Sequence, residues 1–271
     1  MHTDLSYLTR DNLSKSLSIT SDKLINFTKS PKKFYYKKSK RKKNGGTRIL
    51  EIPIHSLKLV QKYLLKKILY KLPISPMLFG GPGSSTKKAV ISHTQKATVT
   101  AMDINNFYPS IKSYHIRNVF LQHKATKEIA EILTRLVTYK NHLPQGAPTS
   151  TYVGLLVLQS AAQQIEKMLK KIPRSSFSIY VDDIIISGPE GIKRFVPIIR
   201  KILKRYRFEI NDKTNIMNRD KEQVCLNIGL NNGIEPPKSY LQELKELARK
   251  VPASDPRLRH KKAYIDFLLN N

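Results

Sequence analysis

Hydrophobic residues recur at helical spacing over residues 56–72 of the chain. The positions that share one face are Leu57, Val60, Leu64, Ile68 and Leu72. Lysines occupy other positions around the same helix. This pattern predicts an amphipathic helix with one face against a core, which Pro73 and Pro76 close.

Similar patterns predict helices over residues 128–139, 151–171, 191–206, 238–250 and 256–269. Pro197 predicts a kink or an interruption in the third of these. Residues 1–30 predict short helices, and the candidate N-caps are Thr3, Ser14 and Ser21.

Apolar and β-branched runs predict strands at 97–104, 177–181 and 184–188. Residues 29–50 predict a basic loop and hairpin with Asn44-Gly45-Gly46 as the turn. Since these strands interleave with helices, we expect an α+β fold around an antiparallel sheet.

Two adjacent acids, Asp182 and Asp183, stand inside the apolar hairpin predicted over residues 177–188. Burying one carboxylate without a partner costs several kcal/mol, and two neighbouring carboxylates also repel each other. A divalent cation compensates such a pair. The alternative is an acidic pair at an exposed hairpin tip. Gly, Asn and Pro are missing there, and Val181 and Ile184 flank the acids, which favours a metal site.

Asp103 ends the strand predicted at 97–104, and Asn105, Asn106 and Pro109 then break the pattern. We therefore expect Asp103 to meet the acid pair of the hairpin. Three carboxylates on one sheet suit two Mg²⁺ ions, with Mn²⁺ as the alternative, because these cations prefer oxygen ligands. Two such ions roughly 3.5–4 Å apart activate an attacking hydroxyl and stabilise a leaving pyrophosphate.

The chain is strongly basic, with 49 Lys and Arg against 20 Asp and Glu, a net charge of +29 over 271 residues. This excess predicts a polyanionic partner. Basic residues crowd between residues 29 and 43 around Phe34, Tyr35 and Tyr36, which suits phosphate contacts and base stacking. A solvated basic loop is the alternative.

A single cysteine, Cys225, excludes an intrachain disulfide and a Cys-rich zinc site. The first residues lack the pattern of a signal peptide, and apolar runs such as Val153–Leu158 are too short to span a bilayer. We therefore expect a cytoplasmic protein that binds no membrane.

Three motifs resemble those of reverse transcriptases. Met-Asp-Ile-Asn-Asn-Phe-Tyr-Pro-Ser-Ile (102–111) resembles motif A, Leu-Pro-Gln-Gly-Ala-Pro-Thr-Ser (143–150) motif B, and Tyr-Val-Asp-Asp (180–183) motif C. They begin about 40 residues apart, in the family's order. The resemblance covers roughly residues 40–235 and is strongest to retron-type enzymes of bacteria.

This resemblance implies a right-hand polymerase fold with fingers, an antiparallel-sheet palm and a short helical thumb. The N-terminal helices and basic fingers would occupy residues 1–95. The palm would occupy 96–235 with a fingers segment inserted at 112–150, and the thumb 236–271. The residues expected to bind nucleic acid are Lys37, Lys38, Arg41, Lys42, Lys238, Lys245 and Arg249. For any single lysine, a solvated surface is the alternative.

The resemblance also implies roles for single residues. Asp103, Asp182 and Asp183 match the metal-binding catalytic carboxylates, and the backbone of Ile104 would lie beside the metal and the triphosphate. Tyr108 matches the aromatic gate under the sugar, which would collide with a 2′-hydroxyl and favour deoxynucleotides. A packed core tyrosine is the alternative.

Further nucleotide contacts are implied outside the acid motifs. Gln145 matches the motif B glutamine beside the incoming nucleotide. Arg48 and Lys43 match the basic pair of the fingers that binds the triphosphate, with Lys42 as the alternative to Lys43. Lys213 matches the motif D lysine that protonates pyrophosphate, and an inert surface lysine is the alternative.

By this resemblance the protein is an RNA-directed DNA polymerase that copies part of a structured cognate RNA into single-stranded DNA. The family implies deoxynucleotides as substrates, a host RNase H, and a separate effector protein in antiphage defence. Two signatures depart from the retron pattern. Ala89 and Val90 replace an Asn-Ala pair ahead of His93, and Val224–Asn227 replaces a Val-Thr-Gly sequence. The alternatives are another defence or group II-like reverse transcriptase, a polymerase that needs no template, and a non-catalytic RNA-binding scaffold.

Overall fold

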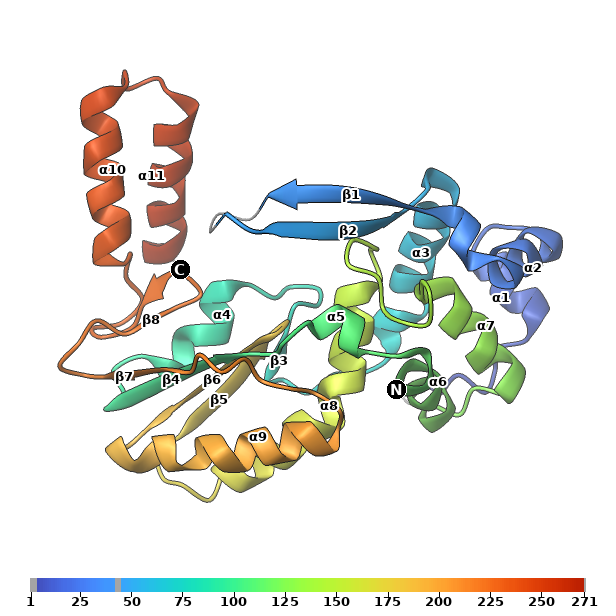
Figure 1. Ribbon diagram of the computed structural model, residues 1–271, viewed down its shortest axis with the longest axis horizontal. Coiled ribbons are helices and arrows are strands. Elements are labelled where there is room, and N and C mark those ends of the chain that lie inside the picture. The colour runs from blue at the N-terminus through green and yellow to red at the C-terminus, as the bar shows by residue number, and fades with distance from the viewer. Residues whose placement is uncertain (1–3, 42–44, 271) are drawn as a thin grey trace. The chain divides into compact units, whose positions relative to one another are not determined.

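The computed structural model describes residues 4–41 and 45–270 (Figure 1). The chain divides into two compact units. Unit 1 comprises residues 1–75, 80–82 and 105–160, and unit 2 comprises residues 76–79, 83–104 and 161–271. Within the described ranges, none of the helices combines the length and the apolar character needed to cross a bilayer. The mixed helices and strands confirm the α+β class.

Unit 2 is built on a five-stranded sheet in the order β3-β5-β6-β4-β7. Its strands are β3 (Leu78–Phe79), β4 (Thr98–Asp103), β5 (Ser176–Tyr180), β6 (Asp183–Gly188) and β7 (Asn215–Asn218). Neighbouring strands are antiparallel, as expected, except that β3 runs parallel to β5. A small hairpin of β8 (Val224–Cys225) and β9 (Ile228–Gly229) accompanies the sheet.

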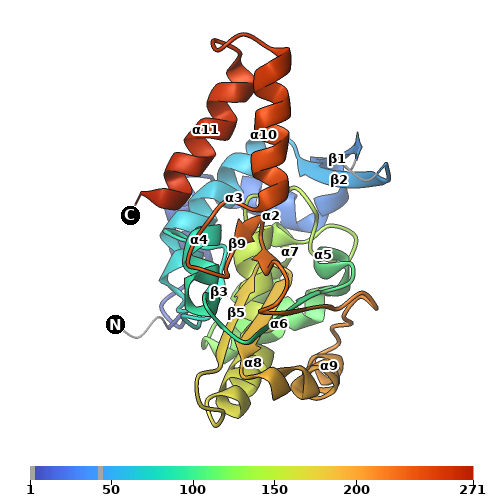
Figure 2. The same cartoon turned by 90° about the vertical axis from the view of Figure 1, so that its left-hand side faces the viewer.

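The two faces of this sheet are both covered. On one face, Val99, Ile185 and Met217 join a buried cluster with Val90 of α4 (Thr86–Val90) and Leu268. The amphipathic helix α9 (Val196–Arg205) lies along the opposite face (Figures 1 and 2). Because alternate side chains of a strand point to opposite faces, the apolar runs of β4 and β6 follow from this double burial.

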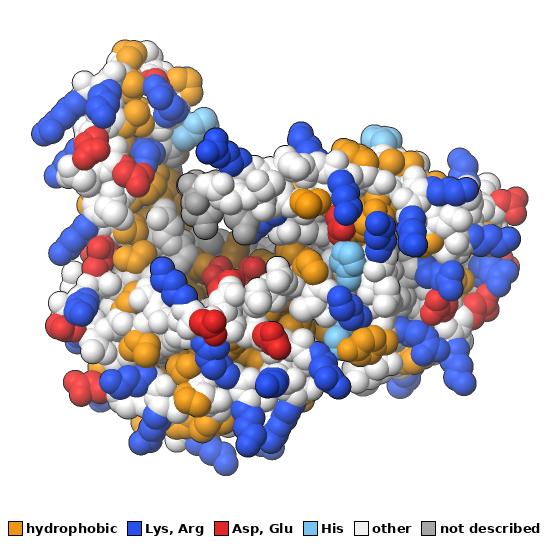
Figure 3. Space-filling model, viewed as in Figure 1, with side chains coloured by type: hydrophobic (Ala, Val, Ile, Leu, Met, Phe, Trp, Pro, Cys, Tyr) orange, Lys and Arg blue, Asp and Glu red, His pale blue; other side chains and the backbone are white. Residues whose placement is uncertain are grey.

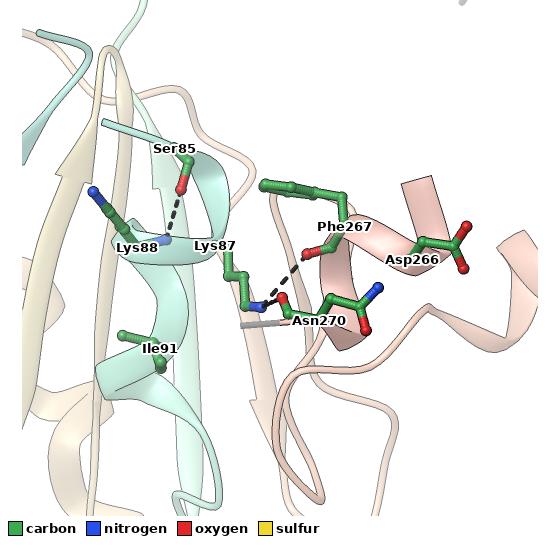
Figure 4. Close-up of a pocket in the computed structure, with 7 residues that line it drawn as sticks. All are labelled: Ser85, Lys87, Lys88, Ile91, Asp266, Phe267 and Asn270. Atoms are coloured by element: carbon green, nitrogen blue, oxygen red, sulfur yellow. Dashed lines mark hydrogen bonds between the residues drawn. The ribbon is translucent and has the colours of Figure 1, made fainter. Parts of the chain in front are cut away.

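Two C-terminal helices, α10 (Lys238–Lys250) and α11 (Pro256–Leu269), form a helical hairpin in unit 2. Lys87 Nζ donates to the carbonyl oxygens of Asn270 at 2.6 Å and Phe267 at 3.5 Å (Figure 4). Its positive charge therefore meets the negative end of the α11 dipole. A cavity of about 520 Å³ lies at this contact between α4 and α11.

Unit 1 combines helices with a two-stranded hairpin. Its helices are α1 (Arg10–Ser16), α2 (Ser21–Lys29), α3 (His55–Lys67), α5 (Phe107–Ser110), α6 (Ser113–Gln122), α7 (Lys127–Val137) and the first half of α8 (Ser150–Leu169). The hairpin pairs β1 (Tyr35–Arg41) with β2 (Thr47–Pro53). Short 3₁₀ helices span Pro31–Phe34 and Leu69–Lys71.

The N-cap predictions were wrong for the described residues. Helix α1 begins after Thr9, whose hydroxyl accepts from Asn12 N while the Asn12 side chain accepts from Thr9 N. This capping box satisfies two backbone N–H groups at the start of α1, whereas Ser14 lies inside the helix. Helix α2 begins after Thr20 rather than at a cap on Ser21. Thr3 lies outside the described residues.

The segment at 191–206 starts as a 3₁₀ helix, Glu190–Phe195, and continues as α9. Pro197 lies in the first turn of α9, where its missing N–H costs no hydrogen bond. The predicted interruption near Pro197 is therefore confirmed, and it separates two helices.

Candidate active site

The two adjacent acids lie at a tight hairpin turn. Tyr180 of β5 pairs with Asp183 of β6, so Val181 and Asp182 form the two-residue connection. The tip location matches the alternative interpretation, although Val181, Asp182 and Asp183 are only partly exposed. Val181 has φ of +59°, an uncommon conformation for a β-branched residue. Its N–H donates to the carbonyl of Phe79 at 3.0 Å, which fixes the turn to β3.

Sheet register brings Asp103 to the same turn. Asp103 is the direct partner of Asp183 in the antiparallel pairing of β4 with β6. Directly opposed residues have Cβ atoms roughly 4.5–5.5 Å apart. The N–H of Ile104 donates to the carbonyl of Asp182 at 3.0 Å, which ties the strand end to the turn. We call Asp103, Asp182 and Asp183 the acid cluster.

The acid cluster is electrostatically coupled. Burial, followed by the negative charges of Asp182 and Asp103, raises the pKa of Asp183 from 3.8 to about 7. A positive charge placed here would reverse this shift, because it favours the ionised carboxylate. The cluster therefore has the electrostatics of a cation-binding site.

The acids do not form a complete cage on their own. Across the residues that the structure describes, no three His, Cys, Asp or Glu side chains are grouped so that they could hold a metal ion. Mg²⁺ usually keeps several waters and takes one or two carboxylates together with substrate phosphates. The oxygen donors of the cluster fit Mg²⁺ bound in that way, with waters or substrate phosphates completing its coordination.

Asn211 contacts the acid cluster and was missed by sequence reasoning. Its backbone N–H donates to the carbonyl of Asp103 at 2.9 Å, and its side-chain Nδ2 donates to Asp103 Oδ2. An isolated bridge between Ile104 and Ile210 holds the two segments together. The only sequence signal was proximity, because Asn211 lies two residues before the candidate Lys213.

Lys213 is exposed in the segment between Ile210 and β7. The guanidinium of Arg200 on α9 donates to several acceptors of residues 210–214. Arg200 is a second residue that the sequence did not reveal. The proton-donor role of Lys213 stays a prediction.

Two nucleotide-binding candidates belong to unit 1 and are held by local contacts. The hydroxyl of Tyr108 on α5 is 3.1 Å from Thr151 Oγ1 of α8. The carbonyl of Gln145 accepts from the N–H of Glu51 at 2.8 Å, which fastens the motif B loop to β2. In that loop Gly146 has φ of +131°, and a Cβ there would lie 3.3 Å from Glu51 O. Glycine is therefore required.

The basic candidates are solvent-exposed. Arg48 pairs with Lys40 across the β1–β2 hairpin. Lys43 and its alternative Lys42 lie outside the described residues. The exposed candidates on β1 and α10 are Lys37, Lys38, Arg41, Lys238, Lys245 and Arg249. Lys and Arg side chains are spread over the face shown in Figure 3. Their contact with nucleic acid stays a prediction.

His93, the retained residue of the retron signature, lies in the core of unit 2 with no exposed surface. Its Nδ1 is 2.7 Å from Ser187 Oγ and its Nε2 is 2.9 Å from Ser178 Oγ. Burial, with a smaller effect of Lys96, lowers its pKa to about 3. The imidazole is therefore neutral and links β5 to β6.

The chain is similar to known proteins in sequence and in fold. A family model described as reverse transcriptase (RNA-dependent DNA polymerase) matches residues 37–250. The chain is similar to the retron Se72 reverse transcriptase of Salmonella heidelberg, with 28% identity over 94% of this chain and 71% of that protein. The retron Mx65 reverse transcriptase of Myxococcus xanthus is 25% identical, over 84% of this chain and 58% of that protein. The retron Ec86 reverse transcriptase of Escherichia coli is 24% identical, over 94% of this chain and 81% of that protein.

Among solved structures, telomerase from Candida albicans in complex with a fragment of telomeric RNA has a TM-score of 0.56 at 13% identity. That match covers 79% of this chain and 50% of the telomerase. Apo telomerase from Candida tropicalis, truncated from its C-terminal domain, has a TM-score of 0.55 at 12% identity, over 81% of this chain and 61% of that one. At such identities the likeness concerns the fold alone, and it confirms the right-hand polymerase fold.

Proposed function

Because the chain belongs to the reverse transcriptase (RNA-dependent DNA polymerase) family, we propose that it copies part of a structured cognate RNA into single-stranded DNA, as a retron-type enzyme. The observation that carries this proposal is the register that sets Asp103 opposite Asp183, beside Asp182. Its similarity to three retron reverse transcriptases supports the retron type. The chain spans 58% of the Myxococcus relative, so the activity of the whole protein is part of the proposal.

Asp103, Asp182 and Asp183 would hold two Mg²⁺ or Mn²⁺ ions, together with the backbone of Ile104 and the phosphates of the nucleotide. Bound there, the ions would supply charge stabilisation for the attacking 3′-hydroxyl and the leaving pyrophosphate. Burial, followed by the charges of Asp182 and Asp103, raises the pKa of Asp183, and this supports the assignment because a bound divalent cation would favour the ionised carboxylates. Lys213 would donate a proton to the departing pyrophosphate.

The remaining candidates would select and hold the nucleotide. The guanidinium of Arg48 suits a triphosphate, with Lys43 as its partner. The ring of Tyr108, fixed through Thr151, would exclude a 2′-hydroxyl. Gln145 would lie beside the incoming nucleotide in a loop that β2 holds in place.

The partners are proposed from charge and resemblance. A net charge of +29 suits a folded RNA that serves as template and primer. A host RNase H would trim that RNA in the cytoplasm, and a separate effector protein would act with the RNA–DNA product in antiphage defence.

The proposal is tested by incubating the purified protein and its copurifying RNA with deoxynucleotides and Mg²⁺. We expect DNA covalently joined to a defined hairpin RNA, detected by sequencing the products before and after RNase treatment. The Asp182→Asn/Asp183→Asn variant should make none. Equal absence of product from the parent and the variant, with the RNA still bound, would instead indicate a non-catalytic scaffold.

A further inference from the structure

We infer that Asn211 is a positioning residue for Asp103, and that Arg200 fixes the segment that carries Asn211 and Lys213. These roles presuppose the proposed polymerase function, and they extend it from the acid cluster to the residues that hold it. Both residues belong to unit 2, with the acid cluster.

Asn211 contacts Asp103 through its backbone and through its side chain. The backbone bond, 2.9 Å long, fixes where the segment meets the end of β4. The side-chain bond joins Nδ2 to Asp103 Oδ2. An ionised carboxylate can only accept hydrogen bonds, so the amide must present its NH₂ group here. The second carboxylate oxygen, Oδ1, is then oriented by the contact made at the first.

A neutral amide suits this position because it orients a carboxylate without neutralising it. A lysine in place of Asn211 would compete with a divalent cation for Asp103. Another acid there would add to the repulsion within the cluster. Hydrogen-bond partners that orient metal-binding side chains typically contribute 10–100-fold to metal affinity or activity. Asn211 is such a hydrogen-bond partner for Asp103.

Arg200 fastens the same segment to α9. Its Nη1 donates to Ile210 O at 3.1 Å. Its Nη2 donates to Asn211 O and to Thr214 Oγ1, each at 2.8 Å. A longer contact of 3.4 Å joins Nη2 to Asp212 O. A planar guanidinium presents several donors in fixed directions, which an ammonium group cannot reproduce. Since α9 packs on the sheet, Arg200 links the position of Asn211 to the core of unit 2.

Lys213 lies between two residues that Arg200 binds, Asp212 and Thr214. Its backbone is therefore restrained while its side chain stays exposed. One arginine thus sets the position of a candidate proton donor and of a carboxylate-orienting amide.

Asn211→Ala tests the first role without relying on activity. Mn²⁺ binding to the metal-free protein, followed by electron paramagnetic resonance, should weaken by about 10–100-fold. Asn215→Ala is the matched control, because Asn215 is an exposed asparagine on the neighbouring β7. Unchanged Mn²⁺ affinity in Asn211→Ala, with a parental melting temperature, would overturn the role of Asn211.

Arg200→Gln and Arg200→Lys test the second role. We expect kcat for DNA synthesis to fall by about 10-fold or more in Arg200→Gln, because small misplacements at a reaction centre are costly. The KM for deoxynucleotides should stay near that of the parent, since α9 carries none of their proposed contacts. The kcat of Arg200→Lys should lie between those of the parent and Arg200→Gln. Arg205→Gln removes an equal charge from an exposed site at the end of α9 and should behave as the parent.

The outcomes separate this inference from the proposed function. If the parent protein makes no DNA, the proposed function fails. The Mn²⁺ affinities of Asn211→Ala and Arg200→Gln can then still be compared with those of their controls, Asn215→Ala and Arg205→Gln. If the parent is active and Arg200→Gln keeps both its kcat and its Mn²⁺ affinity, the role of Arg200 is refuted. Should Arg200→Gln not fold, Arg200→Lys decides by the same two measurements.

Discussion

Replacing Asp183 with asparagine should stabilise the metal-free protein while it abolishes DNA synthesis. The pKa of Asp183 is raised from 3.8 to about 7 in the folded protein, so the folded state binds this proton more tightly than the unfolded chain does. The contribution of this group to stability is therefore greatest at low pH, and it is lost as the pH rises from about 4 through 7. Asparagine has a similar shape and never ionises, so the variant escapes this loss.

The size of the effect follows from the shift. A pKa change of about 3 units corresponds to about 4 kcal/mol at most, and partial exposure of the side chain reduces this to about 2 kcal/mol. For a chain of this length, we expect the melting temperature of Asp183→Asn to exceed that of the parent by about 4 °C near pH 8 without metal. Near pH 4, below the shifted range, the difference should vanish.

The assay is thermal unfolding between about pH 4 and pH 8, with a chelator or with Mg²⁺ present. In the proposed site Mg²⁺ would bind only the folded state, so it should raise the melting temperature of the parent and leave Asp183→Asn nearly unchanged. Asp220→Asn, at an exposed acid in the same unit, is the control and should follow the parent. An Asp183→Asn protein that is no more stable than the parent near pH 8 would refute the electrostatic reasoning. An equal response of both proteins to Mg²⁺ would refute the metal assignment.

Three further predictions concern other parts of the chain. Tyr108→Ala should lower the preference for deoxynucleotides over ribonucleotides by about 10-fold or more, measured as the ratio of kcat/KM values, and an unchanged ratio would favour a packing role for Tyr108. Replacing Lys238, Lys245 and Arg249 together with glutamine should make the slope of log affinity against log salt for duplex binding less negative by about 2–3. An unchanged slope would mean that α10 makes no phosphate contacts. Lys87→Gln should destabilise the end of α11 by about 0.3–1 kcal/mol, measured as faster amide exchange in residues 264–269. Amide exchange as slow as in the parent would show that the Lys87 contact is dispensable.

The sequence predicted long elements well, because burial repeats along them at a fixed period. Helices α10 and α11 and strands β4, β5 and β6 lie where the pattern predicted them, within one or two residues. Strand β7 was not predicted, because its four residues, Asn-Ile-Met-Asn, carry one buried side chain and two polar ends. The two-residue strand β3 is too short for any period.

The acids of the candidate site could be predicted, since charge inside an apolar hairpin is conspicuous. Asn211 and Arg200 could not, because polar residues near a loop are ordinary in sequence. They matter only through partners at a distance along the chain, Asp103 for the first and residues 210–214 for the second. Helix starts were misplaced for a similar reason, since several Ser and Thr residues compete for the cap and local geometry selects one.

The pairing of β4 with β6 makes the acid cluster sensitive to insertions and deletions. Side chains alternate between the faces of a sheet, so moving one strand by a single residue exchanges its two faces. A one-residue deletion within β4 would bring Ile104 into the place of Asp103 and move the carboxylate into the place of Met102, on the side occupied by α9. Both β4 and β6 can therefore change the identity of their apolar residues during evolution, but they cannot change their length independently of each other.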